Sequence, residues 1–243
     1  MTAIVIPLRS RAPDVRVGGD GLPANLIVEP WVNMSSNTFL RSISKLHEHY
    51  VHIPRVQVLA SHISTALTGC KTVIDLGCGD TRLSWTLQKY LPEVRFEGFD
   101  LIARESATGI PVHAFDGKTL ALPDSSVDAV MLIDVLHHAD DPYALLKEAN
   151  RVAAKRIVIK DHLLGRWGAK PTLKFMDWVS NRPYSVNLPY NYWSEAQWRN
   201  AWSRLELQVV DYRTHLGLYP VAVRLLFESG LHFIATLTKD VDP

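Results

Sequence analysis

The fold is decided by Thr72-Val-Ile-Asp-Leu-Gly-Cys-Gly79, followed a short way on by Phe96-Glu-Gly-Phe-Asp100. The first segment predicts a buried strand that runs into a tight turn, because an apolar run is followed at once by two glycines. The second predicts another short apolar strand, and it ends in an acid. A glycine turn lets the backbone approach a ligand, and a carboxylate at the next strand tip accepts hydrogen bonds from ribose hydroxyls. This pairing indicates an α/β fold that holds a nucleoside.

The glycine turn also bears on which nucleoside is bound. A dinucleotide turn reads G-x-G-x-x-G, but Arg82 stands where the third glycine belongs. Asp80 would place a negative charge beside the phosphates, where a helix N-terminus favours anions. A pyrophosphate therefore fits poorly, and a nicotinamide-dependent reductase is disfavoured. S-adenosylmethionine has no phosphate and carries a sulfonium cation, which suits an acidic turn.

The turn resembles the first motif of class I S-adenosylmethionine-dependent methyltransferases, acid-x-Gly-x-Gly-x-Gly. Asp75, Gly77 and Gly79 match it, and Thr81 departs at the last position. Downstream, residues 112–117 resemble the third-strand motif, and residues 129–138 resemble strand four with its active-site tip. The resemblance covers roughly residues 70–163 and is strongest to the ubiquinone/menaquinone-biosynthesis-like branch that acts on small molecules.

This resemblance implies a Rossmann-like three-layer α/β sandwich. Its sheet has seven mostly parallel strands in the order 3-2-1-4-5-7-6, with one antiparallel strand in the final pair. We expect those last two strands at residues 207–213 and 231–237, and a capping box at Ser194 opening a helix through Trp202. We expect residues 1–68 to form an irregular segment and lid helices, with a break near Pro54. The core then spans 69–243, with an irregular, aromatic lid insertion at about 164–193.

The cofactor site implied by the resemblance follows the strand tips. Asp100 would bind the ribose, Asp116 and Gly117 the adenine edge, and Asp134 the methionine moiety. Each acid also has a purely structural interpretation: Asp100 could cap the next turn, Asp75 could be a buried acid bonded to backbone amides, and Asp116-Gly117 is a dipeptide that turns without a ligand. The complete expected cofactor set is Asp75, Gly77, Cys78, Gly79, Asp100, Leu101, Asp116, Gly117 and Asp134.

Histidines supply the candidates for acid–base chemistry. Methyl transfer is an in-line displacement with a neutral leaving group, so only the acceptor's proton needs a base. His137 and His138 follow the strand-four tip, and imidazole titrates near neutral pH. His162 follows Asp161 at the end of strand five, on the same edge of the sheet. We expect one of these three histidines to be catalytic.

Two further motifs are set aside. His47-Glu-His49-Tyr-Val-His52 lacks the i, i+4 spacing of a one-helix zinc site, so we expect no metal. Asn187-Leu-Pro-Tyr190 spells a motif with which nucleic-acid amino methyltransferases grip a flipped base, but it lies far beyond strand five rather than directly after strand four. The net charge of +1 also gives no bulk electrostatic case for nucleic acid.

The acceptor region is expected in the aromatic segment, where rings can shape an apolar pocket that sheds water. We expect Trp178, Tyr190 and Tyr192 to face the acceptor, together with Lys160 at the strand-five tip. The 243-residue chain has two cysteines and no long apolar run, which fits a cytoplasmic setting without a membrane span; whether it is a monomer or a homodimer stays open.

These observations predict a methyltransferase that acts on a small, apolar or aromatic organic acceptor, with O- or N-methylation favoured and S-adenosylhomocysteine as product. The alternatives are a nucleic-acid methyltransferase and a catalytically silent relative that binds the cofactor for a structural or regulatory role. Fold alone cannot separate these alternatives, so the case depends on the ordered acids at the strand tips.

Overall fold

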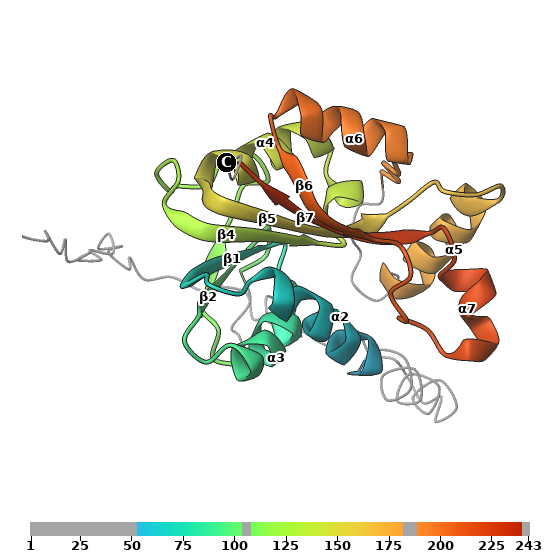
Figure 1. Ribbon diagram of the computed structural model, residues 1–243, viewed down its shortest axis with the longest axis horizontal. Coiled ribbons are helices and arrows are strands. Elements are labelled where there is room, and N and C mark those ends of the chain that lie inside the picture. The colour runs from blue at the N-terminus through green and yellow to red at the C-terminus, as the bar shows by residue number, and fades with distance from the viewer. Residues whose placement is uncertain (1–52, 104–107, 182–188, 240–243) are drawn as a thin grey trace, which may run out of the picture. The chain divides into compact units, whose positions relative to one another are not determined.

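A mixed sheet of seven strands, in the order β3-β2-β1-β4-β5-β7-β6, forms the centre of the part of the chain that the computed structural model describes, residues 53–103, 108–181 and 189–239 (Figure 1). The strands are β1 Thr72–Leu76, β2 Arg95–Asp100, β3 Val112–Ala114, β4 Val127–Ile133, β5 Ala153–His162, β6 Gln208–Arg213 and β7 His232–Thr238. The helices are α2 Ile53–Ala66, α3 Arg82–Tyr90, η2 Leu136–His138, α4 Pro142–Val152, α5 Ala169–Asn181, α6 Glu195–Arg204 and α7 Val221–Phe227.

The strand order and directions confirm the Rossmann-like prediction. The pairs from β3 through β5 are parallel, whereas β7 runs antiparallel to both β5 and β6. In a parallel sheet the carboxyl ends of the strands meet at one edge, and ligands bind outside that edge. The tips of β1, β2, β4 and β5 therefore bring the candidate site residues together.

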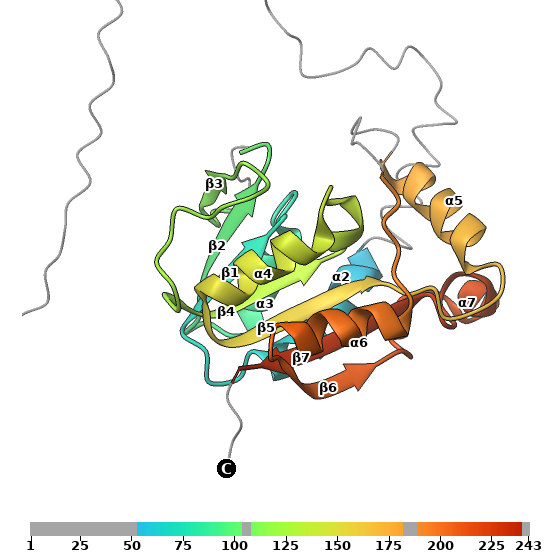
Figure 2. The same ribbon diagram turned by 90° about the horizontal axis from the view of Figure 1, so that it is seen from above.

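Helices cover both faces of the sheet, so each central strand is buried on two sides (Figures 1 and 2). In β4, Val130 and Leu132 face the cluster that includes Trp198 and Trp202 of α6. The alternate residues Ala129 and Met131 face the cluster that includes side chains of α2 and α3. This period-two division between two cores is what makes the strand apolar throughout rather than alternating.

Two helix starts follow their capping chemistry. Asp141 accepts a hydrogen bond from the Ala144 amide, and Pro142 occupies the first turn of α4. Ser194 and Gln197 form the predicted reciprocal capping box at the start of α6. Pro54 lies in the first turn of α2; the residues before Ile53 lie outside the described part of the chain, so the break near Pro54 stays a prediction.

The prediction that residues 164–193 are irregular is wrong for much of the segment, because α5 occupies Ala169–Asn181. Pro171 is tolerated in its first turn, where a missing amide hydrogen breaks no helical bond. Leu173 and Asp177 are buried one turn apart, so the helix has an inward face that the dense aromatic residues concealed. α7 was also not anticipated.

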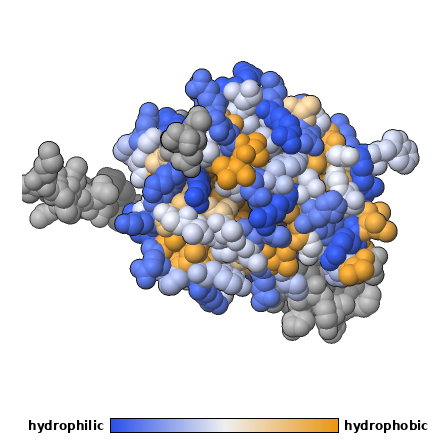
Figure 3. Space-filling model, in the orientation of Figure 1, coloured by the Kyte–Doolittle hydropathy of each residue, from blue (hydrophilic) through white to orange (hydrophobic). Residues whose placement is uncertain are grey.

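α5 and α7 lie side by side beyond the end of β5 (Figures 1 and 2), and both helices carry exposed apolar side chains. Leu225 is 85% exposed and Val221 78% exposed on α7, and Phe175 and Trp178 are about half exposed on α5. Figure 3 shows hydrophobic surface over α7, interrupted by hydrophilic residues. The proposed division at residue 68, and the lid role of 164–193, stay predictions.

Candidate active site

The glycine turn after β1 is held open by backbone geometry. Gly77 and Gly79 have φ angles of 80° and 53°, in the left-handed region that favours glycine. The Gly77 amide donates to the Phe99 carbonyl oxygen at 2.7 Å, which ties the turn to β2. A Cβ on Gly77 would lie 2.9 Å from Cγ1 of Val135 and closer still to Cγ2. Gly77 is therefore required both by conformation and by the close approach of the β4 tip.

Thr81 explains the departure from the family motif. It stands at the third glycine position and adopts φ 61°, so the chain keeps the left-handed conformation with a non-glycine residue. Its hydroxyl lies 2.6 Å from the Thr108 hydroxyl and donates to the Asp80 carbonyl at 2.6 Å. Thr81 therefore combines two hydroxyl contacts with a backbone conformation that glycine adopts without strain.

Asp75 lies beneath the turn. Its carboxylate is 3% exposed and accepts a hydrogen bond from the Ser84 hydroxyl at 2.5 Å. Burial raises the pKa of Asp75 to about 6, against the opposing effect of the Ser84 bond. Asp75 is thus a buried acid, as its structural interpretation expects, but its partner is the Ser84 side chain rather than backbone amides.

Asp100 joins the turn to the segment after β2. Its Oδ2 accepts from the Gly79 amide at 2.9 Å, and its Oδ1 accepts from the Ile102 amide at 3.1 Å. These bonds fix the carboxylate at the strand tip, where the resemblance expects the ribose hydroxyls. They also fit the structural interpretation, since the carboxylate does cap the following turn.

The expected adenine residues lie together. A Cβ on Gly117 would lie 3.2 Å from the Leu101 side chain, which is 69% exposed. Asp116 accepts from the amides of Lys118 and Thr119 at 2.8 Å each, and these bonds hold its pKa below the usual range. Asp116-Gly117 thus forms a turn of its own beside the apolar side chain of Leu101.

An open cleft of about 560 Å³, its open side included, lies against the turn. Cys78 also lines it, and Gly98 leaves room for the thiol, since a Cβ there would lie 2.5 Å from Cys78 Sγ. Burial raises the pKa of Cys78 to about 12, so it stays a neutral thiol. Further lining residues are Asp75, Gly77, Asp80, Ile133, Asp134 and Arg55.

Asp134 at the tip of β4 carries two cationic partners. Its carboxylate pairs with Lys160 Nζ and with Arg55 Nη2, the latter at 2.6 Å. Burial by itself would raise the pKa of Asp134, but the charges of Lys160 and then Arg55 outweigh it and hold the pKa well below its usual range. The backbone there adopts φ 57°, so this tip is conformationally strained.

Lys160 does not present its amine to the cleft. The side chain is fully buried, and Nζ lies 3.4 Å from His232 Nδ1 as well as pairing with Asp134. This burial does not fit a side chain that touches an acceptor, so the geometry favours Lys160 as a support for Asp134. Arg55, on α2, lines the cleft instead. Sequence reasoning missed it because α2 lies outside the window of the resemblance.

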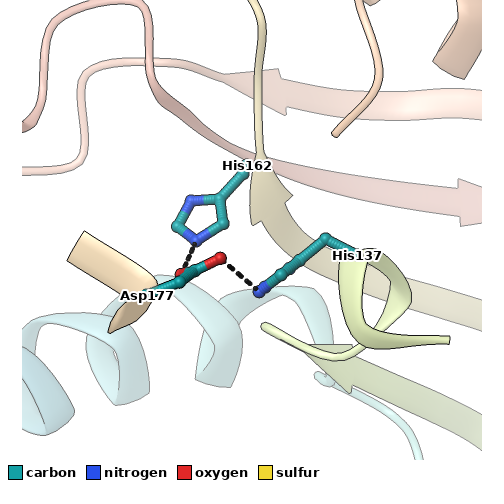
Figure 4. Close-up of side chains that lie close together, drawn as sticks. All are labelled: His137, His162 and Asp177. Atoms are coloured by element: carbon teal, nitrogen blue, oxygen red, sulfur yellow. Dashed lines mark hydrogen bonds and ion pairs between the residues drawn. The ribbon is translucent and has the colours of Figure 1, made fainter. Parts of the chain in front are cut away.

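A buried cluster of histidines and acids, here called the histidine cluster, lies behind the β4 tip. It comprises His137, His162, Asp177, Asp161, Tyr192 and His232. His137 Nδ1 lies 2.6 Å from Asp161 Oδ1, and His162 Nε2 lies 2.9 Å from Asp177 Oδ1. The rings of His137 and His162 point toward Asp177 from η2 and β5 (Figure 4).

The charges of the histidine cluster oppose one another. Burial by itself would lower the pKa of His137, but the Asp161 and Asp177 carboxylates outweigh it and raise that pKa. Burial lowers the pKa of His162, and its bond to Asp177 offsets this only in part. The two histidines therefore differ in proton affinity although both face Asp177.

His138 differs from the other two predicted histidines because it is partly exposed. Burial, and then the neighbouring charge of His137, lowers the pKa of His138 to about 4. The ring is therefore neutral at neutral pH. The ring centroid of His138 lies 4.0 Å from that of His137, so His138 packs against the histidine cluster.

The predicted acceptor residues differ in their exposure. Tyr192 is buried, and its hydroxyl donates to Asp177. Tyr190 is partly buried and Trp178 is half exposed on α5. Asn187 and Leu188, the first half of the set-aside tetrapeptide, lie outside the described residues, as do His47, His49 and His52. Asp177 and His232 carried no sequence signal, because neither belongs to a motif.

The comparisons with known proteins agree with this geometry. The model of a methyltransferase domain family matches residues 74–156, from β1 to the start of β5. Over these residues the chain has the domain of a class I S-adenosylmethionine-dependent methyltransferase. The predicted family, activity and cofactor are thereby confirmed; the acceptor is not established. No curated protein matches the chain.

Solved structures share the fold at low sequence identity. A possible histamine N-methyltransferase from Thermotoga maritima is 16% identical, with 83% of this chain and 97% of that chain covered and a TM-score of 0.56. A Haloferax volcanii methyltransferase, solved with the Trm112 methyltransferase activator, is 17% identical, with 82% and 95% covered and a TM-score of 0.55. Geranyl diphosphate methyltransferase in complex with GPP and sinefungin is 13% identical, with 75% and 78% covered and a TM-score of 0.57.

None of the helices within residues 53–103, 108–181 and 189–239 is both long and apolar enough to cross a membrane.

Proposed function

We propose that this methyltransferase transfers the methyl group in line to an oxygen or nitrogen atom of a small organic acceptor with apolar or aromatic character. The observation that carries the proposal is the juxtaposition at the β4 tip. Asp134 lines the cofactor cleft, and the neutral, partly exposed His138 follows four residues later on η2. A cofactor cleft and a side chain able to accept a proton thus lie on one short segment.

For the cofactor, we assign the ribose hydroxyls to Asp100 and the adenine to the group formed by Leu101, Asp116 and Gly117. The turn at Gly77, Cys78 and Gly79 borders the methionine end. Arg55 brings a positive charge to the same cleft beside Asp134. We assign it to an anionic group there, either the methionine carboxylate or an acidic acceptor, because guanidinium binds carboxylates bidentately.

We assign proton removal to His138. A base whose pKa is about 4 takes protons weakly, so it suits acceptors whose own proton is easily lost. Phenols and protonated amines meet that condition better than aliphatic alcohols or carbon acids, and carboxylic acids are already ionised at neutral pH. His137 and His162 are almost fully buried, and we assign them to positioning the turn that carries His138 rather than to contact with the acceptor.

The aromatic segment supports the apolar side of the acceptor. Trp178 on α5 and Tyr190 in the loop before α6 are partly accessible, and rings of this kind exclude water around a methyl group in transfer. Tyr192 and Lys160 are assigned supporting roles. The net charge of +1 supports a partner other than nucleic acid, and two unpaired cysteines support a cytoplasmic setting.

The test measures S-adenosylhomocysteine release over a panel of phenols, carboxylic acids, amines, aliphatic alcohols and carbon acids. We expect turnover with the first three classes. His138→Ala should lower kcat about 100-fold with the KM for S-adenosylmethionine unchanged, which is the size of a general-base contribution. Turnover confined to aliphatic alcohols or carbon acids would refute the acceptor class. Cofactor binding without turnover on any class would favour the catalytically silent relative.

A further inference from the structure

The hydrogen bonds around the histidine cluster determine where its protons lie. His232 Nε2 is 3.0 Å from the Phe227 carbonyl oxygen, which can only accept, so Nε2 carries the proton and Nδ1 has a lone pair. His162 Nδ1 lies 3.1 Å from that lone pair. Two lone pairs would repel at this distance, so His162 Nδ1 carries a proton and donates it. The neutral form of His162 therefore leaves its Nε2 bare.

The same reasoning applies to His137. Its Nδ1 donates to Asp161 Oδ1 at 2.6 Å, and Asp161 is held by the Leu136 and His162 amides. His137 Nε2 is consequently bare in the neutral form. It is buried without a hydrogen-bond partner, and the nearest acid is Asp177 Oδ2 at 3.5 Å. In these neutral forms, the lone pairs on His137 Nε2 and His162 Nε2 both face the Asp177 carboxylate.

Without a proton or a metal ion between them, these groups repel. His162 Nε2 lies 2.9 Å from Asp177 Oδ1, and all three ligand atoms lie within 4.8 Å of one another. Ligand atoms around a tetrahedral ion with bonds of about 2.0–2.1 Å are separated by about 3.4 Å, so small side-chain shifts would give the polyhedron. We propose that His137 Nε2, His162 Nε2 and an oxygen of Asp177 bind one divalent transition-metal ion, zinc by donor type.

The surroundings of each ligand match those of metal sites. Metal-bound histidines donate their other ring N–H to a carboxylate or another acceptor, as His137 does to Asp161 and His162 does to His232. Ligating carboxylates are hydrogen-bonded in turn, as Asp177 is by Tyr192. Two imidazoles and one carboxylate form a donor set that zinc accepts, with a further position left to water.

The proposed ion would cross-link three elements of the fold. His137 lies on η2, His162 ends β5, and Asp177 lies on α5 (Figure 4). It would fix α5 to the sheet edge and hold the turn that bears His138. The inference concerns metal binding alone, so it stands or fails separately from the proposed acceptor. It also revises the sequence-based expectation of no metal.

The test uses the untagged full chain, since an added histidine tag would bind metal itself. The protein is stripped with a chelator, and Zn²⁺ is titrated in competition with a chromophoric chelator. We expect one equivalent per chain for the wild type, and less than a tenth for His162→Gln and Asp177→Asn. His113→Gln serves as the matched control, because His113 is exposed and bonds to Glu97 away from the cluster.

His47, His49 and His52 need a control of their own, and their triple Gln variant should keep the full equivalent. Because buried substitutions can impair folding, the wild type gives a second readout. Its Tm should rise by several degrees with zinc and fall again on chelation. X-ray absorption on the zinc form should show two imidazole ligands. Wild-type protein that binds less than a tenth of an equivalent, or zinc retained in both cluster variants, would overturn the proposal.

Discussion

The ion pair beneath the β4 tip allows a quantitative prediction. Lys160 is fully buried, and Asp134, its partner, is 26% exposed. Asp134→Asn keeps the shape of the side chain but leaves the ammonium buried without a counter-charge. Removing one partner of a buried pair costs about 3–5 kcal/mol. We expect about 3 kcal/mol, at the low end, because Asp134 is partly hydrated and His232 Nδ1 remains within 3.4 Å of the amine.

For a chain of this size, that loss corresponds to a Tm lowered by roughly 6–12 °C. The assay is urea unfolding at pH 7 with a thermal scan alongside. Adding Lys160→Met to the Asp134→Asn variant should recover about 2 kcal/mol, because it removes the uncompensated charge. Glu195→Gln is the matched control: its pair with Arg199 is exposed on both sides, so the loss should be less than about 1 kcal/mol.

The pH dependence has a definite sign. Because the folded-state pKa of Asp134 is held well below its usual range, its contribution is present above about pH 4 and is lost as the pH falls through the folded value. The difference between wild type and Asp134→Asn should be constant from pH 6 to 8 and shrink in acid. A loss below about 1 kcal/mol at pH 7, or no recovery in the double variant, would refute the reasoning.

Three further predictions concern the glycine turn. Gly77→Ala should cost about 3 kcal/mol in unfolding experiments, whereas Gly69→Ala, with φ 82° but open space around it, should cost only about 1–2 kcal/mol; equal losses would contradict the clash with Val135. The folded-state pKa of Asp75 is raised to about 6, so the stability that this group contributes to the wild type is lost as the pH rises from about 4 to 6. The free energy of unfolding of Asp75→Asn should therefore gain up to about 3 kcal/mol over that of the wild type across this range. A difference that does not change with pH would refute the prediction. Native Cys78 should resist iodoacetamide at pH 8 in a mass-spectrometric assay, and rapid single alkylation there would contradict its raised pKa.

The sheet could be predicted because its signals are local. Apolar runs ending in Gly77 or Asp100 specify strands and their tips, and the parallel arrangement then fixes the edge at which they meet. The capping box at Ser194 likewise needs only neighbouring residues. These features do not depend on which distant segments pack together.

The histidine cluster could be predicted only in part. His137 and His162 follow strand tips, so their proximity is implied by the topology. Asp177 reaches them from α5, which no local pattern indicates; His232 lies in a strand that was predicted, but nothing local marks it as a partner of His162. Arg55 on α2 is a similar case, since its contact with Asp134 joins residues 79 positions apart. Long-range packing, rather than motif or spacing, creates these contacts.

The central claim is that the cleft at the glycine turn binds S-adenosylmethionine through Asp100. Calorimetric titration with S-adenosylhomocysteine, with NADPH as the control ligand, tests it most directly. We predict micromolar binding of the first and none of the second. Asp100→Ala should weaken binding by about 1.5–3 kcal/mol, whereas Glu97→Ala on the same strand should leave it unchanged. Binding of NADPH instead, or unchanged affinity in Asp100→Ala, would contradict the account.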